Sequence, residues 1–311
     1  MQGWRKLMED TQISDINIGP SKDTYIFGVF DGHGGTEVTK FVEHHFTEEF
    51  LKNENYSKKD IKKALEENYQ KMDELMFEKE GNEELFSEYL KSQKEISKLR
   101  ENNYYPKKIK LLSHEPLHPK EKKDAIISMF TGSTANILVI QDKKLYFSNA
   151  GDSRSIICKK GQPIAMSIEH KPSIPEEAKR IEKTGAWIKD GRIFGNLNIS
   201  RGLGDLEYKK DKKLKPEEQV LISLPDVKIE NLGEDIDFIV LASDGVWECK
   251  NNQEICDFFT EKFKKKPNGK ISKFIEELFD EIFAPNVYNE TGTGCDNMSC
   301  IVIKIKKKDE K

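Results

Sequence analysis

Three aspartates in this chain stand at the ends of apolar runs, where they could bind a metal ion together. Asp31 directly follows Tyr25–Phe30, and Asp152 and Asp244 close two later runs of the same kind. Such short runs, rich in β-branched and aromatic residues, predict buried strands. A rigid sheet can hold carboxylates from distant parts of the chain side by side, and Mg²⁺ and Mn²⁺ prefer oxygen ligands. The pattern favours a site for hard divalent metals, although each aspartate alone fits a turn or cap equally well.

The residues that follow Asp31 add a flexible backbone and an acid–base group. Gly32, Gly34 and Gly35 can adopt positive φ and let the backbone approach a ligand closely. His33 lies among them, and an imidazole can exchange a proton near neutral pH. Because Asp-Gly is also a common turn, this stretch indicates a site only together with the other two aspartates.

Composition excludes several classes of function. The chain has 311 residues, which is enough for one large domain or two ordinary ones. A net charge of −4 implies no general affinity for nucleic acid. No apolar run approaches the roughly 18 residues of a membrane span, and the N-terminal residues contain no signal-peptide core. The five cysteines form no CxxC pair, so we expect free thiols in a reducing compartment, the cytoplasm or also the nucleus.

The periodicity of apolar residues predicts mixed helices and antiparallel strands. Turn residues separate successive strands by only a few positions, unlike the βαβ rhythm of a dinucleotide-binding sheet. Helices are expected at Gly35–Lys52, after a cap at Ser57, and at Pro175–Thr184, Asn251–Phe263 and Ile271–Phe283. Strands are expected at Gly132–Ile140, Lys144–Ala150, Arg154–Cys158 and Cys300–Ile305.

A charged segment over residues 80–125 interrupts this pattern. It begins with helical character and then becomes irregular around Pro106, Pro116 and Pro119. We interpret it as an insertion, partly helical and partly mobile, that is either a decoration or a docking element.

Seven motifs in one order resemble the metal-dependent serine/threonine protein phosphatases of the type 2C class. The resemblance covers about residues 1–304, and it rests on the ordered combination rather than on any single motif. The motifs are Arg5–Asp10, Asp31–Gly35, Gly132–Ala135, Asn149–Arg154, Ser200–Asp205, Ala242–Glu248 and Asp296–Ser299.

The resemblance implies a set of ligands for two divalent ions, Mg²⁺ or Mn²⁺. Asp31 would bridge the two ions, and Asp244 and Asp296 would hold one of them. Glu9 and the carbonyl oxygen of Gly32 would lie near the other ion. Asp152 with Asp244 would form a weaker third site. So many acids in one cleft would repel one another unless cations neutralised them, which independently supports metal binding.

Two further side chains have implied catalytic roles. Arg5 would grip the substrate phosphate through its planar guanidinium, the alternative being a surface salt bridge. His33 would act as general acid toward the leaving seryl or threonyl oxygen. The alternative for His33 is a hydrogen bond that supports the metal ligands. Asp205 would orient the flap or the residues around the metals, and we do not count it among the ligands.

The implied fold is α+β, a four-layer αββα sandwich of two mostly antiparallel sheets flanked by helices. A single catalytic domain would span residues 1–304, with the insertion at about 80–125 and a flap near the active site at about 170–220. Residues 305–311 would form a charged tail.

The implied function is hydrolysis of phosphoserine and phosphothreonine in proteins by a water activated between two divalent metals. The enzyme would be a phosphoric monoester hydrolase that acts on phosphorylated proteins in signalling. We expect a monomer, with no nucleic acid or membrane partner. Alternatives are a catalytically weak pseudophosphatase that binds phosphoproteins, and a metallophosphatase for small phosphate esters.

Overall fold

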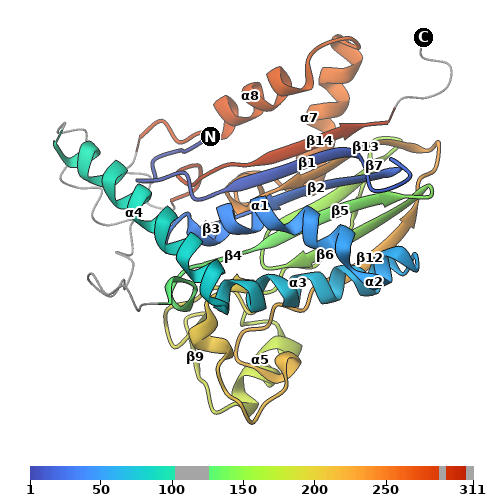
Figure 1. Cartoon of the computed structure of the whole chain (residues 1–311). Coiled ribbons are helices and arrows are strands. Elements are labelled where there is room, and N and C mark those ends of the chain that lie inside the picture. Colours follow the sequence, from blue (N-terminus) through green and yellow to red (C-terminus); the bar gives the residue numbers. More distant parts are fainter. Residues whose placement is uncertain (102–125, 287–291, 306–311) are drawn as a thin grey trace.

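The structure is a computed structural model that describes residues 1–101, 126–286 and 292–305. Its centre is a pair of sheets that lie face to face (Figure 1). The first sheet has the order β1 (Thr11–Ile18), β2 (Thr24–Phe30), β5 (Ala135–Gln141), β6 (Lys144–Ala150) and β12 (Asp226–Asn231). The second has the order β14 (Cys300–Lys304), β13 (Ile236–Ala242), β7 (Arg154–Lys159) and β8 (Gln162–Ala165).

All strand pairs in the two sheets are antiparallel, as expected from the short turns between them. The inner faces carry the apolar residues that alternate along each strand, and these interdigitate between the sheets. Buried side chains in this layer include Val29, Leu138, Phe147, Ile157, Ile239 and Leu241. This packing fixes the ends of the strands relative to one another, and the candidate ligands lie at those ends.

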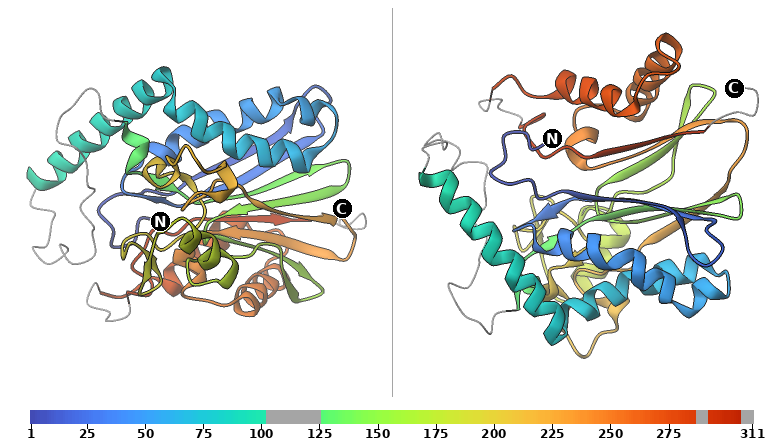
Figure 2. Two further views of the ribbon diagram at one scale, coloured as in Figure 1. Left: turned by 90° about the horizontal axis from the view of Figure 1, so that it is seen from below. Right: turned by 45° about the horizontal axis from the view of Figure 1, so that its top comes forward.

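Helices cover both outer faces, which completes the four layers seen in Figure 2. The helices against the first sheet are α1 (Glu37–Lys52), α2 (Glu54–Ser57), α3 (Ile61–Phe77) and α4 (Lys79–Glu101). Those against the second are α6 (Asp244–Trp247), α7 (Asn252–Lys265) and α8 (Ile271–Ile282). The predicted α+β sandwich is confirmed. Within the described part of the chain, no helix is both long and apolar enough to cross a membrane.

The predicted cap at Ser57 is wrong. Ser57 is the last residue of the short α2, and α3 begins four residues later. Asp60 caps α3, since its carboxylate accepts a hydrogen bond from the Lys63 N–H at 3.2 Å. Asp and Ser are both good N-caps, so the residue type alone could not locate the boundary.

The first half of α4 belongs to the helical layer rather than forming a loose insertion. Leu85 is fully buried in the cluster formed with α1 and α3. Ser92 bonds Thr36 at 3.0 Å, and Glu88 accepts from Lys40 at 3.3 Å. The irregular part predicted for residues 102–125 lies outside the described residues. Any part of the predicted insertion that only decorates the surface would therefore begin well after residue 80.

The segment predicted as a flap has a small apolar core of its own. It contains α5 (Pro175–Lys183), β9 (Ile188–Lys189), β10 (Arg192–Ile193) and the 3₁₀ turns η3 (Leu206–Lys209) and η4 (Pro216–Glu218). Ile181, Ile193, Leu197 and Leu221 are buried together inside it. In Figure 1 this segment lies beside one end of the sandwich, below the helices of the first layer.

The prediction that all five cysteines are free thiols is wrong for two of them. Cys158 on β7 and Cys256 on α7 form a disulfide, with Cα atoms 6.1 Å apart. Cys249, Cys295 and Cys300 are free. The pair is separated by 98 residues, so only the packing of α7 on the second sheet brings it together.

Candidate active site

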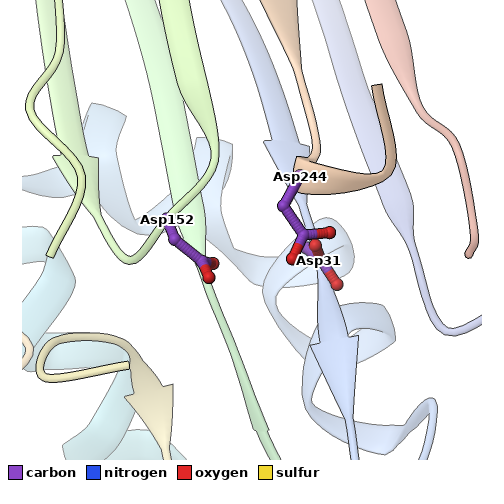
Figure 3. Close-up of side chains that lie close together, drawn as sticks. All are labelled: Asp31, Asp152 and Asp244. Carbon is purple, nitrogen blue, oxygen red and sulfur yellow. The ribbon is translucent and has the colours of Figure 1, made fainter. Parts of the chain in front are cut away.

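Asp31, Asp152 and Asp244 meet at one end of the sandwich, as the strand-end pattern predicts. Asp31 follows β2, Asp152 follows β6, and Asp244 is the first residue of α6. Their carboxylate oxygens include a set that lies within 4.8 Å of one another. In Figure 3, Asp31 and Asp244 face each other and Asp152 points toward them from a neighbouring strand end.

Hydrogen bonds hold in place the backbone at Asp31 and the loop that carries Asp152. The Asp31 N–H donates to Thr134 Oγ1 at 3.1 Å, and the Thr134 N–H donates to the Asp31 carbonyl at 2.9 Å. Thr134 also bonds Ser153, next to Asp152, at 2.8 Å. The His170 ring accepts a hydrogen bond at Nδ1 from the Gly151 backbone N–H at 3.2 Å, and the His170 backbone N–H donates to the Gly151 carbonyl. His170 therefore holds the loop that carries Asp152.

The electrostatics of this cluster fit a divalent cation. Burial raises the pKa of Asp31 well above its ordinary value, and the charges of Asp244 and Asp152 raise it further. Burial and Asp152 do the same to the pKa of Asp244. Buried carboxylates so close together cannot all be ionised without a nearby positive charge. Oxygen-only donors of this kind suit Mg²⁺ or Mn²⁺.

The segment that carries Glu9 packs directly against Gly32. A Cβ atom on Gly32 would lie 2.4 Å from the Glu9 carbonyl oxygen, so only glycine fits here. Thr39 donates its hydroxyl to the same carbonyl at 2.9 Å. Burial raises the pKa of the Glu9 carboxyl to about 7, against the opposing effect of His33 and Arg5. The Glu9 backbone therefore lies directly against Gly32.

Arg5 and Asp296 form an ion pair at the edge of the site. Arg5 Nη2 lies 2.5 Å from Asp296 Oδ2, and the arginine side chain remains 41% exposed. Asn297 holds the two chain segments together, since its amide donates to the Gln2 and Leu7 carbonyls and its oxygen accepts from the Glu9 N–H. The surface salt bridge that was the alternative role for Arg5 is thus present in the structure, with Asp296 as its partner. Solvent reaches the Arg5 side chain.

The structure does not bring every predicted ligand into one set. Glu9 and Asp296 do not join the three aspartates whose oxygens lie within 4.8 Å, in the part of the chain that is described. Asp296 acts on the cluster as a neighbouring charge, because it contributes to the raised pKa of Asp31 and of Asp244, and it also raises the pKa of Glu9.

Two site residues were missed or left without a firm role by sequence reasoning. Lys171 forms an ion pair with Asp152. Asp205 lies 2.5 Å from His33 Nε2. Burial disfavours protonation of His33, but the Asp205 carboxylate outweighs it and raises the pKa of the imidazole. Asp205 closes the motif Ser200–Asp205, whereas Lys171 lies outside the seven motifs, and nothing in the sequence spacing shows which side chain either residue contacts.

Comparisons with known proteins agree with this geometry. The family model described as "Protein phosphatase 2C" matches residues 1–88 and 77–291. "Probable protein phosphatase 2C 6" of Paramecium tetraurelia is 43% identical, over 98% of this chain and 90% of the relative. "Probable protein phosphatase 2C 21" of Arabidopsis thaliana is 37% identical, over 99% and 85%.

Solved structures share the fold at much lower identity. The crystal structure of serine-threonine phosphatase 2C from Toxoplasma gondii superposes with a TM-score of 0.68 at 15% identity. The match covers 98% of this chain and 92% of that chain. The same sandwich therefore forms from sequences that share few residues.

Proposed function

Because the chain belongs to the protein phosphatase 2C family, we propose that it hydrolyses phosphoserine and phosphothreonine in proteins with two Mg²⁺ or Mn²⁺ ions. As a family member it is a protein serine/threonine phosphatase and acts on phosphoproteins. The observation that supports the metal chemistry most directly is the group Asp31, Asp152 and Asp244, whose carboxylate oxygens lie within 4.8 Å of one another.

The proposed ligands are the carboxylates predicted from the sequence. Asp31 would contact both ions, Asp244 and Asp296 one of them, and Glu9 with the Gly32 carbonyl would lie near the other. Asp152 with Asp244 would serve a weaker third ion. When bound, such ions act as Lewis acids that lower the pKa of water and polarise the phosphoryl oxygens.

We propose that Arg5 orients the substrate phosphate. Its guanidinium contacts Asp296 through Nη2 at 2.5 Å. A guanidinium has five N–H donors, so the other donors remain able to bind phosphate oxygens in a planar fork. The ion pair with Asp296 then holds the fork in position rather than competing with the substrate.

His33 is placed to move a proton. A seryl or threonyl oxygen leaves as a strongly basic alkoxide unless it is protonated in the transition state. The His33 side chain is 34% exposed, which allows contact with a substrate. We propose that it donates its proton to that oxygen.

Further predictions concern the oligomeric state, the location, the partners and the domain limits of the protein. A monomeric state, a location in the cytoplasm or nucleus, and the lack of nucleic acid and membrane partners stay predictions. The domain limits at residues 1–304 also stay a prediction.

The test of the proposed function compares substrates of different classes. The purified protein with Mg²⁺ or Mn²⁺ is expected to release phosphate from phosphothreonine and phosphoserine peptides much faster than from a sugar phosphate. Tight phosphopeptide binding without turnover would instead indicate a pseudophosphatase. Faster turnover of the sugar phosphate would indicate an enzyme for small esters.

The His33→Gln variant tests the general-acid role. It is expected to lower kcat for a phosphothreonine peptide about 100-fold, within the usual range for loss of a general acid. Hydrolysis of p-nitrophenyl phosphate should change far less, because nitrophenolate leaves without protonation. The measurement is kcat for both substrates at one pH. Equal losses on both would assign His33 to supporting the ligands instead.

A further inference from the structure

The small sheet beside the metal cluster joins three distant parts of the chain at Gly132. Its order is β11 (Leu203–Gly204), β4 (Gly132–Ser133) and β3 (Gly32–His33). His33 pairs with Gly132 on one side, and Gly204 pairs with the same residue on the other. Asp205 follows Gly204 directly, so the register sets its side chain opposite His33 across Gly132.

Asp205 and His33 form a closely fitted pair. Asp205 Oδ2 lies 2.5 Å from His33 Nε2, and the Asp205 side chain is only 5% exposed. A Cβ atom on Gly132 would lie 2.1 Å from that oxygen and 2.7 Å from that nitrogen. A side chain at position 132 would therefore push the pair apart.

The backbone at Asp205 is held in a conformation that non-glycine residues rarely adopt. Its φ is +49°, in the left-handed region. The Asp205 N–H donates to the Thr131 carbonyl at 2.8 Å, and its own carbonyl accepts from the Tyr208 N–H at 2.9 Å. Such conformations persist where the surroundings over-determine them, often at functional sites.

A buried ion pair anchors both ends of this turn. The Asp73 carboxylate on α3 accepts from the Gly204 N–H at 2.9 Å and from Lys209 Nζ at 2.6 Å. These two donors flank Asp205 in the sequence. The backbone on both sides of Asp205 is thus held from the helical layer.

We propose that Asp205 is a positioning residue for the reaction, which holds the His33 ring through Nε2 and leaves Nδ1 as the nitrogen that protonates the leaving group. This inference rests on the general-acid role given to His33 under the proposed function. Nδ1 has no hydrogen-bond partner among the residues that the structure describes. In the step, the N–H bond at Nδ1 breaks and an O–H bond forms on the seryl or threonyl oxygen as the P–O bond breaks. The Nε2 proton stays on the His33 ring and remains hydrogen-bonded to the Asp205 carboxylate.

A carboxylate that accepts from one ring nitrogen selects the tautomer and the orientation of the other. If Asp205 only anchored the flap, its loss would affect both good and poor leaving groups alike. If Asp205 positions the general acid, its loss should slow only those substrates whose leaving group needs a proton. The leaving-group dependence therefore separates the two roles.

The experiment measures kcat and KM for Asp205→Asn, a change that keeps the shape of the side chain. For a phosphothreonine peptide, kcat is expected to fall at least about tenfold with KM unchanged, while kcat for p-nitrophenyl phosphate stays within about threefold. Glu207→Gln is the matched control, because Glu207 lies two residues further along the same turn and its carboxylate pairs with Lys210 instead of His33. It should behave as the unmodified protein does.

A double variant and a spectroscopic measurement complete the test. Adding Asp205→Asn to His33→Gln should lower kcat by less than about twofold, since both changes remove the same function. Gly132→Ala, which separates the pair without removing either partner, should reproduce the selective loss. In the metal-free protein, NMR should show a low-field Nε2 proton of His33 that Asp205→Asn abolishes.

The outcomes distinguish this inference from the function on which it rests. An unmodified protein that does not turn over phosphopeptides overturns the proposed function. Turnover with a selective loss in His33→Gln, but none in a folded Asp205→Asn, overturns the positioning role alone. An unchanged His33 resonance in Asp205→Asn also overturns it, whatever the kinetics.

Discussion

Asp31→Ala is expected to lower kcat/KM on a phosphoserine peptide at least about a thousandfold, which corresponds to roughly 4 kcal/mol of transition-state stabilisation. Asp31 belongs, with Asp152 and Asp244, to the three carboxylates whose oxygens lie within 4.8 Å of one another. Its loss removes ligand charge where two ions are proposed to meet, so both positioning and activation of the reactants fail together. The measurement is steady-state kinetics in saturating Mn²⁺.

Metal binding gives a second readout for the same variant. Calorimetric titration with Mn²⁺ in the absence of substrate should show weaker binding or fewer sites. Asp235→Ala is a suitable control, because Asp235 is half exposed and pairs with Lys159 at 3.5 Å on the second sheet. That control should change activity little. A loss of less than tenfold in Asp31→Ala would reject its role between two metals.

Removal of divalent ions is expected to abolish activity and to make stability fall as pH rises. EDTA should stop phosphopeptide turnover, and added Mg²⁺ or Mn²⁺ should restore it, since the site offers oxygen ligands. Full activity in chelator would contradict the metal mechanism. The stability effect follows from the raised pKa values of the acids and needs no assay of activity.

The sign of the pH effect comes from proton linkage. Burial raises the pKa of Glu9 to about 7 and that of Asp10 to about 6, and it raises those of Asp31 and Asp244 as well. Between about pH 4, where these carboxyls titrate in the unfolded chain, and pH 7, the folded state binds more protons. Its free energy of unfolding therefore decreases as pH rises through this window.

Thermal unfolding of the chelated protein at pH 5 and pH 8 checks this expectation. The melting temperature should be higher at pH 5. Saturating Mn²⁺ should raise the melting temperature more at pH 8, because the ions replace the protons as partners of the carboxylates. Equal stabilisation by Mn²⁺ at both pH values would argue against the raised pKa values.

Local patterns in the sequence predicted most of the helices and strands and the three aspartates at strand ends, whereas the sandwich itself was implied by the resemblance to the type 2C phosphatases. Asp31, Asp152 and Asp244 each close an apolar run, and strand ends in a packed sheet are rigid enough to aim such side chains. The helices at Glu37–Lys52 and Ile271–Ile282 followed from apolar periodicity. These features depend on neighbours within a few residues, so the sequence by itself determined them.

The contacts that join distant segments were decided by the tertiary structure. Asp205 reaches His33 because β11 and β3 both pair with β4, and Lys171 reaches Asp152 across the loop that His170 holds. Packing likewise placed Leu85 in the core and joined Cys158 to Cys256. Each of these outcomes depends on the register and packing of whole elements, which sequence spacing does not specify.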